Sequence, residues 1–122
     1  FEELIGDGRP CFVPREIPSF ERGVELLRGA ARVVGLAHPF RYDDPAAALA
    51  RCDALDAVER YYPYDRPITG DPVVDETLLD ATIERHDLLE TGGSDAHGTE
   101  LGAAGLDREA YRRLETVLSP EP

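Results

Sequence analysis

The sequence has no lysine, no methionine and no tryptophan, and it has only two cysteines. All 13 basic residues are therefore arginines, and they face 25 aspartates and glutamates, for a net charge of -12. A field this negative disfavours binding of nucleic acid through a broad basic surface. No apolar run approaches the roughly 18 residues that a membrane-spanning helix needs, so we expect a cytoplasmic protein without a membrane partner.

The excess of acid over base is itself informative. A dense carboxylate surface without lysine is typical of proteins from salt-accumulating halophiles, in which high ionic strength screens the repulsion between like charges. A GC-rich genome, which favours arginine codons, is the alternative explanation of the missing lysine. It does not explain the acid excess, so the halophilic interpretation is favoured.

The two cysteines, Cys11 and Cys52, lie far apart and have no CxxC spacing. A single disulfide between them is one interpretation, but buried free thiols in a reducing cytoplasm are favoured. The 122 residues are enough for one small domain and short for a complete enzyme barrel. Because the chain begins at Phe1 rather than at a methionine, we expect a segment of a longer protein.

Short apolar runs alternate with amphipathic stretches that open on helix-capping residues. Strands are expected over 33–37, over 55–59 and from Leu88 into Thr91-Gly92-Gly93. Helices are expected to begin after four caps, two of which are followed by proline: Ser19, Asp44, Asp71 and Asp107. This order predicts parallel strands with helical crossovers, an α/β fold. Three strands are too few for a closed sheet and fit a portion of a barrel.

Polar side chains that can bind metal follow each expected strand. His38 follows the first strand, Glu59 ends the second, and Asp95 and His97 follow the third. The carboxyl ends of strands carry the active site in barrel enzymes. Residues two apart in an extended segment point the same way, so Asp95 and His97 can face one ion. Carboxylate and imidazole together suit Mn, Zn or Fe, although a bare Asp-x-His is more often only a polar turn.

A longer string of motifs changes this balance. It consists of Ala37-His38-Pro39, Leu55-Asp56-Ala57-Val58-Glu59 with Tyr61-Tyr62-Pro63, and Thr91-Gly92-Gly93-Ser94-Asp95-Ala96-His97-Gly98. In order and content it resembles the PHP (polymerase and histidinol phosphatase) family, most closely its branch of phosphoesterases and nucleotide phosphatases. The resemblance extends over nearly the whole chain. One departure is Ala30-Ala31-Arg32, where the family has Ala-Gly-Gly in a turn.

The resemblance implies a distorted, TIM-like (β/α)7 barrel, of which residues 1–122 form the C-terminal part without the N-terminal metal-binding half. It implies two or three divalent ions (Mn, Zn or Fe) with His38, Asp95 and His97 as metal ligands and catalytic residues. The implied reaction is hydrolysis of phosphate esters of nucleotides or small metabolites by a metal-activated water. Three ligands are only part of the family's set, so residues 1–122 alone are expected to be inactive.

Several other side chains have two interpretations. Glu59 is a ligand, a strand-end packing residue or a hydrogen-bond partner of a ligating histidine. Arg41 either binds a substrate phosphate or pairs with Asp43 or Asp44. A tyrosine cluster either stacks on a nucleobase or, as favoured here, packs: Tyr61, Tyr62 and Tyr64. His86, at a helix end, is expected to be structural.

The resemblance also leaves rival functions open. PHP domains occur as non-catalytic, structural appendages of larger proteins, including polymerases. Within enzymes, histidinol phosphate hydrolysis and an amidohydrolase-like reaction are the alternatives. An intact upstream HxH motif would favour catalysis over the appendage.

Overall fold

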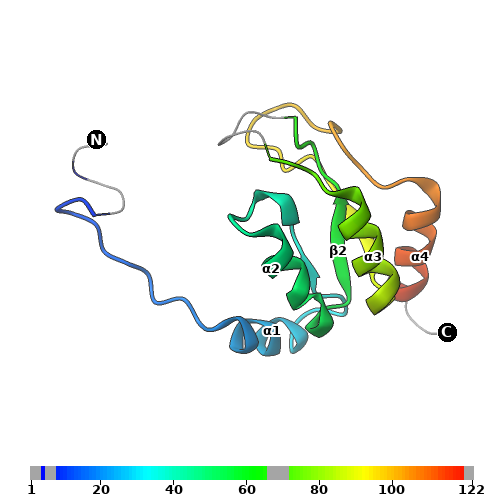
Figure 1. Ribbon diagram of the computed structural model, residues 1–122, viewed down its shortest axis with the longest axis horizontal. Coiled ribbons are helices and arrows are strands. Elements are labelled where there is room, and N and C mark those ends of the chain that lie inside the picture. Colours follow the sequence, from blue (N-terminus) through cyan, green and yellow to red (C-terminus); the bar gives the residue numbers. More distant parts are fainter. Residues whose placement is uncertain (1–3, 5–7, 66–71, 120–122) are drawn as a thin grey trace.

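The computed structural model describes residues 4, 8–65 and 72–119. In this part of the chain helices and strands alternate (Figure 1). The helices are α1 (Phe20–Arg28), α2 (Pro45–Leu49), α3 (Glu76–His86) and α4 (Arg108–Leu118), with short 3-10 turns η1 (Pro39–Arg41) and η2 (Ala50–Ala54). The strands are β1 (Gly35–Leu36), β2 (Ala57–Tyr61) and β3 (Leu89–Gly92).

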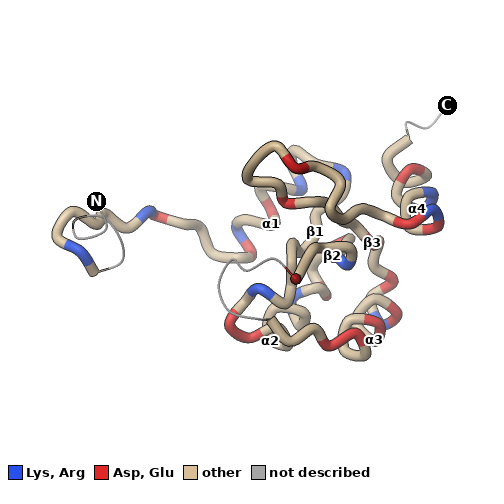
Figure 2. Tube along the Cα trace, turned by 90° about the horizontal axis from the view of Figure 1, so that it is seen from above, with Lys and Arg blue, Asp and Glu red and all other residues tan. Residues whose placement is uncertain are grey.

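The three strands form one parallel sheet in the order β1-β2-β3. Ala57 pairs with Gly35 on one side and with Leu89 on the other. Figure 2 shows α2 and α3 on one side of the strands and α4 beyond β3. The described residues thus have a mixed α/β arrangement with parallel strands, and the seven-stranded barrel stays a prediction.

The core lies where α2, η2 and α3 meet the sheet. Its fully buried side chains come from each of these elements and from the strands: Leu49, Cys52, Val58, Leu79 and Leu88. Burying one such aliphatic side chain contributes about 1.5–3 kcal/mol. This core anchors the carboxyl ends of β1, β2 and β3 beside one another.

The two faces of β2 have different neighbours. Arg60 forms ion pairs with Glu76 and Asp80 of α3, so the even-numbered side chains face that helix. Because side chains alternate along a strand, Ala57, Glu59 and Tyr61 belong to the opposite face. There Glu59 accepts the backbone N–H of His38, two residues after β1, and the Tyr61 hydroxyl donates to Asp107 at the start of α4.

The longest expected helix begins later than predicted. We expected it to start after Asp71-Pro72; the structure begins α3 at Glu76, and Asp71 lies outside the described residues. Asp75 has the same capping chemistry, and its Oδ1 accepts the N–H of Leu78 at 2.9 Å. In this helix Leu79 is buried and Ala81 is exposed.

The expected burial of Cys11 is wrong. Both cysteines are free thiols, but Cys11 is exposed and only Cys52 is buried. Cys11 belongs to an extended segment, residues 11–19, in which every side chain is exposed and which runs away from the rest of the molecule (Figure 1). None of the helices in the described part of the chain is long and apolar enough to cross a membrane.

Candidate metal site

Two of the predicted ligands meet at the carboxyl end of the sheet. His38 lies two residues after the end of β1, and Asp95 lies three residues after the end of β3. Tyr62, the residue after β2, contacts both: its ring centroid lies 5.3 Å from that of His38, and its hydroxyl donates to Asp95 Oδ2 at 3.0 Å. The structure therefore brings His38 and Asp95 together around the side chain of Tyr62.

Both residues have left-handed backbone, with φ of 31° at His38 and 44° at Asp95. Outside glycine such values are uncommon and cost about 1–3 kcal/mol each. The described residues contain one further example, Asp87, which is the C-cap of α3, where left-handed backbone is ordinary. Strained backbone of this kind concentrates at functional sites, and here it coincides with two predicted ligands.

His38 carries a polar atom that lacks a partner. Its Nδ1 is buried and has no hydrogen-bond partner among the residues described. Leaving a buried polar atom unsatisfied costs about 1–3 kcal/mol, so such an atom in a folded protein calls for an explanation. An imidazole nitrogen is a good ligand for Mn, Zn or Fe, and an ion bound there would supply the missing partner.

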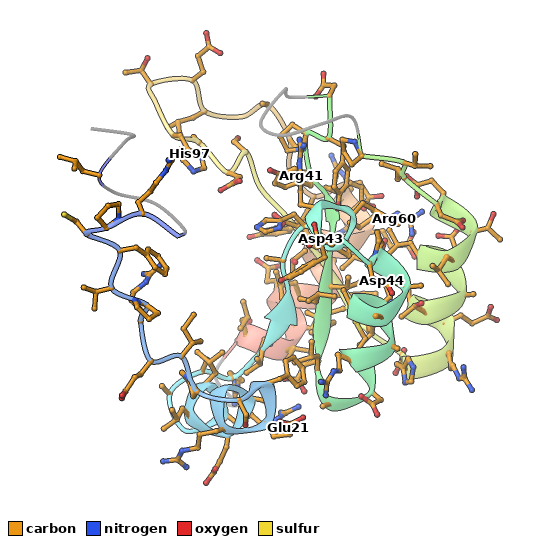
Figure 3. The ribbon with its side chains drawn as sticks, turned by 60° about the vertical axis from the view of Figure 1, so that its left-hand side comes forward. Glu21, Arg41, Asp43, Asp44, Arg60 and His97 are labelled. Atoms are coloured by element: carbon orange, nitrogen blue, oxygen red, sulfur yellow. The ribbon has the colours of Figure 1, made fainter. Side chains whose placement is uncertain are left out.

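His97 lies on the loop after β3 and is exposed. In Figure 3 it stands apart from Arg41. Its Nδ1 lies 2.8 Å from the carbonyl oxygen of Asp95. A carbonyl only accepts, so Nδ1 is the donor of this contact, and in the neutral imidazole Nε2 then has the lone pair, an arrangement typical of ligating histidines.

The structure does not assemble all three predicted ligands. Within residues 4, 8–65 and 72–119, no three His, Cys, Asp or Glu side chains form a group that could hold a metal ion. We expected Asp95 and His97 to point the same way because residues two apart do so in extended backbone. The left-handed φ of Asp95 interrupts that alternation.

Of the two glycines before Asp95, Gly92 serves close packing and Gly93 does not. Gly92 pairs with Tyr61 where the register between β2 and β3 shifts. A β-carbon at Gly92 would lie 2.5 Å from the Tyr61 Cβ, whereas one at Gly93 would meet nothing nearer than Glu59 Oε1, at 4.0 Å. Farther along, the Ser94 hydroxyl accepts the N–H groups of Gly102 and Ala103 and closes the loop that holds His97.

Arg41 lies against the tyrosine cluster. Its Nη2 donates to the Tyr64 carbonyl at 3.3 Å, and its guanidinium carbon lies 5.5 Å from the Tyr62 ring centroid and 5.9 Å from that of Tyr64. The rings of Tyr62 and Tyr64 also contact each other, with centroids 4.7 Å apart. Burial, the first cause, raises the pKa of Tyr64 to about 12. Packing therefore accounts for Tyr62 and Tyr64. Asp44, one of the two acidic residues considered as a partner of Arg41, caps α2.

His86 lies at the other end of the sheet. It lines a hollow of about 520 Å³ with Asp56, Asp87 and Arg113 beside the amino ends of β2 and β3. Barrel enzymes carry their chemistry at the carboxyl ends, so this hollow is separate from the candidate metal site. The position of His86 in the last turn of α3 agrees with its expected structural role.

Sequence reasoning gave Tyr62 only a packing or stacking role, and it left Glu59 open among three interpretations, one of which was a hydrogen bond to a ligating histidine. Tyr62 links two predicted ligands, and Glu59 Oε2 accepts the backbone N–H of His38 at 2.8 Å. Their position at the carboxyl end of β2, between the two motif-bearing strands, was the available signal.

No protein-family model, no curated protein and no solved structure matches this chain.

Proposed function

We propose that this chain is part of a metal-dependent phosphoesterase in which His38, Asp95 and His97 are ligands of divalent Mn, Zn or Fe ions. The motif string that resembles the PHP family supports this function. The single observation that carries it is the buried, unpartnered Nδ1 of His38, on left-handed backbone beside the Tyr62 that binds Asp95. Bound divalent ions would neutralise phosphoryl charge and lower the pKa of water.

The chain's own residues prepare the site in distinct ways. His38 offers a nitrogen that has no competing hydrogen bond among the described residues. The Tyr62 hydroxyl orients one carboxylate oxygen of Asp95. The backbone carbonyl of Asp95 accepts from Nδ1 of His97, which favours the tautomer whose Nε2 can bind an ion. The substrates proposed are phosphate esters of nucleotides or small metabolites, with Arg41 as a candidate for contacting the phosphate.

The test is metal-dependent phosphate release, measured on the 122-residue chain and on a longer protein that includes it. The panel contains nucleotides, sugar phosphates and histidinol phosphate, each with Mn²⁺, Zn²⁺ or Fe²⁺. We expect the 122-residue chain alone to be inactive and the longer protein to release phosphate. His38→Ala, Asp95→Asn and His97→Ala should each lower that release at least about 100-fold, since each removes a ligand.

His86→Ala is the matched control, because His86 lies at the opposite end of the sheet. It should leave both metal content and turnover at the level of the unmodified protein. Metal content, measured in parallel, should fall in the three ligand variants while the circular dichroism spectrum stays unchanged. Full turnover in His97→Ala, or no turnover of any ester with any ion, would contradict the proposal.

A structural role within a larger protein is the second candidate. It is favoured by one observation, namely that the described residues do not gather three ligands into one group. This role predicts that the longer protein binds no stoichiometric metal and that ligand substitutions change neither its stability nor its assembly.

A further inference from the structure

We infer that Glu59 is a positioning residue of the proposed site, holding His38 in the left-handed backbone that places its imidazole against Tyr62. The inference rests on the proposed function and extends it to a residue outside the predicted ligand set. Glu59 is half-buried in β2, on the face opposite α3. Its carboxylate reaches the chain after β1 from the neighbouring strand.

The contact with His38 is made to the backbone. Glu59 Oε2 accepts the His38 N–H at 2.8 Å, while the ring of His38 lies against Tyr62 and Tyr42. A hydrogen bond to an ionised carboxylate is shorter and stronger than one to a neutral acceptor. It therefore stabilises a φ of 31° that His38 would otherwise leave.

The second carboxylate oxygen faces the other motif. Glu59 Oε1 lies 4.0 Å from the point where a β-carbon of Gly93 would stand, so it approaches the backbone that leads to Asp95. The two strands approach closely at their start: the ideal β-carbon of Gly35 would lie only 3.1 Å from the Ala57 Cβ. Glu59 thus lies between the two chain segments that carry His38 and Asp95.

Without an acceptor at position 59, the His38 N–H would be left part-buried and unsatisfied. The backbone of His38 would then relax toward extended values, where an ordinary residue is more stable. Relaxation would turn the imidazole away from Tyr62. The predicted consequence is loss of metal binding at His38 with the sheet intact.

The experiment uses the three histidines of the chain as probes. Long-range ¹H–¹⁵N spectra resolve the rings of His38, His86 and His97 during addition of ZnCl₂, and the ¹³C shifts of His38 report its backbone. Glu59→Met has a side chain of similar length without a carboxylate or carbonyl oxygen, and Glu59→Gln retains an acceptor. Glu90→Met is the matched control, because Glu90 also lies in the sheet but pairs with Arg60.

In the unmodified chain Zn²⁺ should shift the His38 ring and leave the His86 ring unchanged. Glu59→Met should weaken the response of His38 about 10- to 100-fold and move its ¹³C shifts toward extended values. Glu59→Gln should restore both, and Glu90→Met should alter neither. If Glu59→Met does not fold, left-handed ¹³C shifts retained in Glu59→Gln support the inference and relaxed ones overturn it.

Two further results would overturn the inference, and they point to different causes. If Zn²⁺ affects the His38 ring neither in the unmodified chain nor in the longer protein that includes it, the proposed metal site fails, and the role of Glu59 fails with it. If Zn²⁺ shifts that ring equally in the unmodified chain and in Glu59→Met, the metal site stands and Glu59 has no positioning role.

Discussion

Replacing Gly92 with alanine tests the closest approach of backbone in the sheet. The added β-carbon would lie 2.5 Å from the Tyr61 Cβ and 2.7 Å from the Tyr61 carbonyl oxygen. Carbon atoms in contact are ordinarily about 3.5 Å apart or more, so β2 and β3 must separate locally by about 1 Å. Tyr61 cannot move aside independently, since the nearest atoms are its backbone and its Cβ.

Overpacking of this kind costs about 1–3 kcal/mol, against a total stability of about 5–15 kcal/mol for a small domain. A loss of about 2 kcal/mol with a urea m value of about 1–2 kcal/mol/M lowers the unfolding midpoint by about 1–2 M. The assay is urea unfolding followed by far-UV circular dichroism, with the m value fitted for each variant.

Gly93→Ala is the matched control, one residue along the chain. Its β-carbon would have nothing nearer than 4.0 Å, and its backbone does not have positive φ. It should leave the midpoint unchanged or raise the free energy of unfolding by about 0.4–1 kcal/mol, because alanine restricts the unfolded chain. Equal midpoints for the two variants would refute the close approach of Gly92 to Tyr61.

Two further predictions concern the thiols and the surface charge. Burial first, and Asp53 second, raise the pKa of Cys52 to about 11, while Cys11 is exposed. Iodoacetamide at pH 8 should therefore add one label to the native chain, at Cys11, and two labels to the chain unfolded in urea, as counted by mass spectrometry. Two labels without urea would disprove the burial of Cys52. The net charge of -12 predicts a melting temperature that rises with KCl from about 0.01 M to 1 M, as the Debye length falls from about 30 Å to 3 Å. A flat or falling melting temperature would remove the halophilic interpretation.

Local chemistry was enough to predict most helix starts. Ser19, Asp44 and Asp107 each accept a backbone N–H from a residue two or three positions ahead, an interaction that involves only neighbours in the chain. The same rule could not choose between Asp71 and Asp75, because both are aspartates that can cap. Burial of Leu79 against the sheet accompanies the start at Glu76.

The parallel arrangement of the strands also followed from the sequence, because apolar runs separated by helical segments have few other ways to pair. The strand limits did not follow: β1 is two residues long where five were expected, and β2 begins two residues later than predicted. Pairing partners in the sheet set those limits. The metal-ligand roles of His38, Asp95 and His97 stay predictions made from motifs.

The geometry of the candidate site was decided by tertiary structure alone. Tyr62 and Asp95 are 33 residues apart in sequence, and Glu59 and His38 are 21 apart. No local pattern predicts which side chain meets which backbone group across neighbouring strands. Left-handed backbone at His38 is unfavourable for the isolated segment. In the folded sheet the Glu59 carboxylate reaches its N–H from the neighbouring strand.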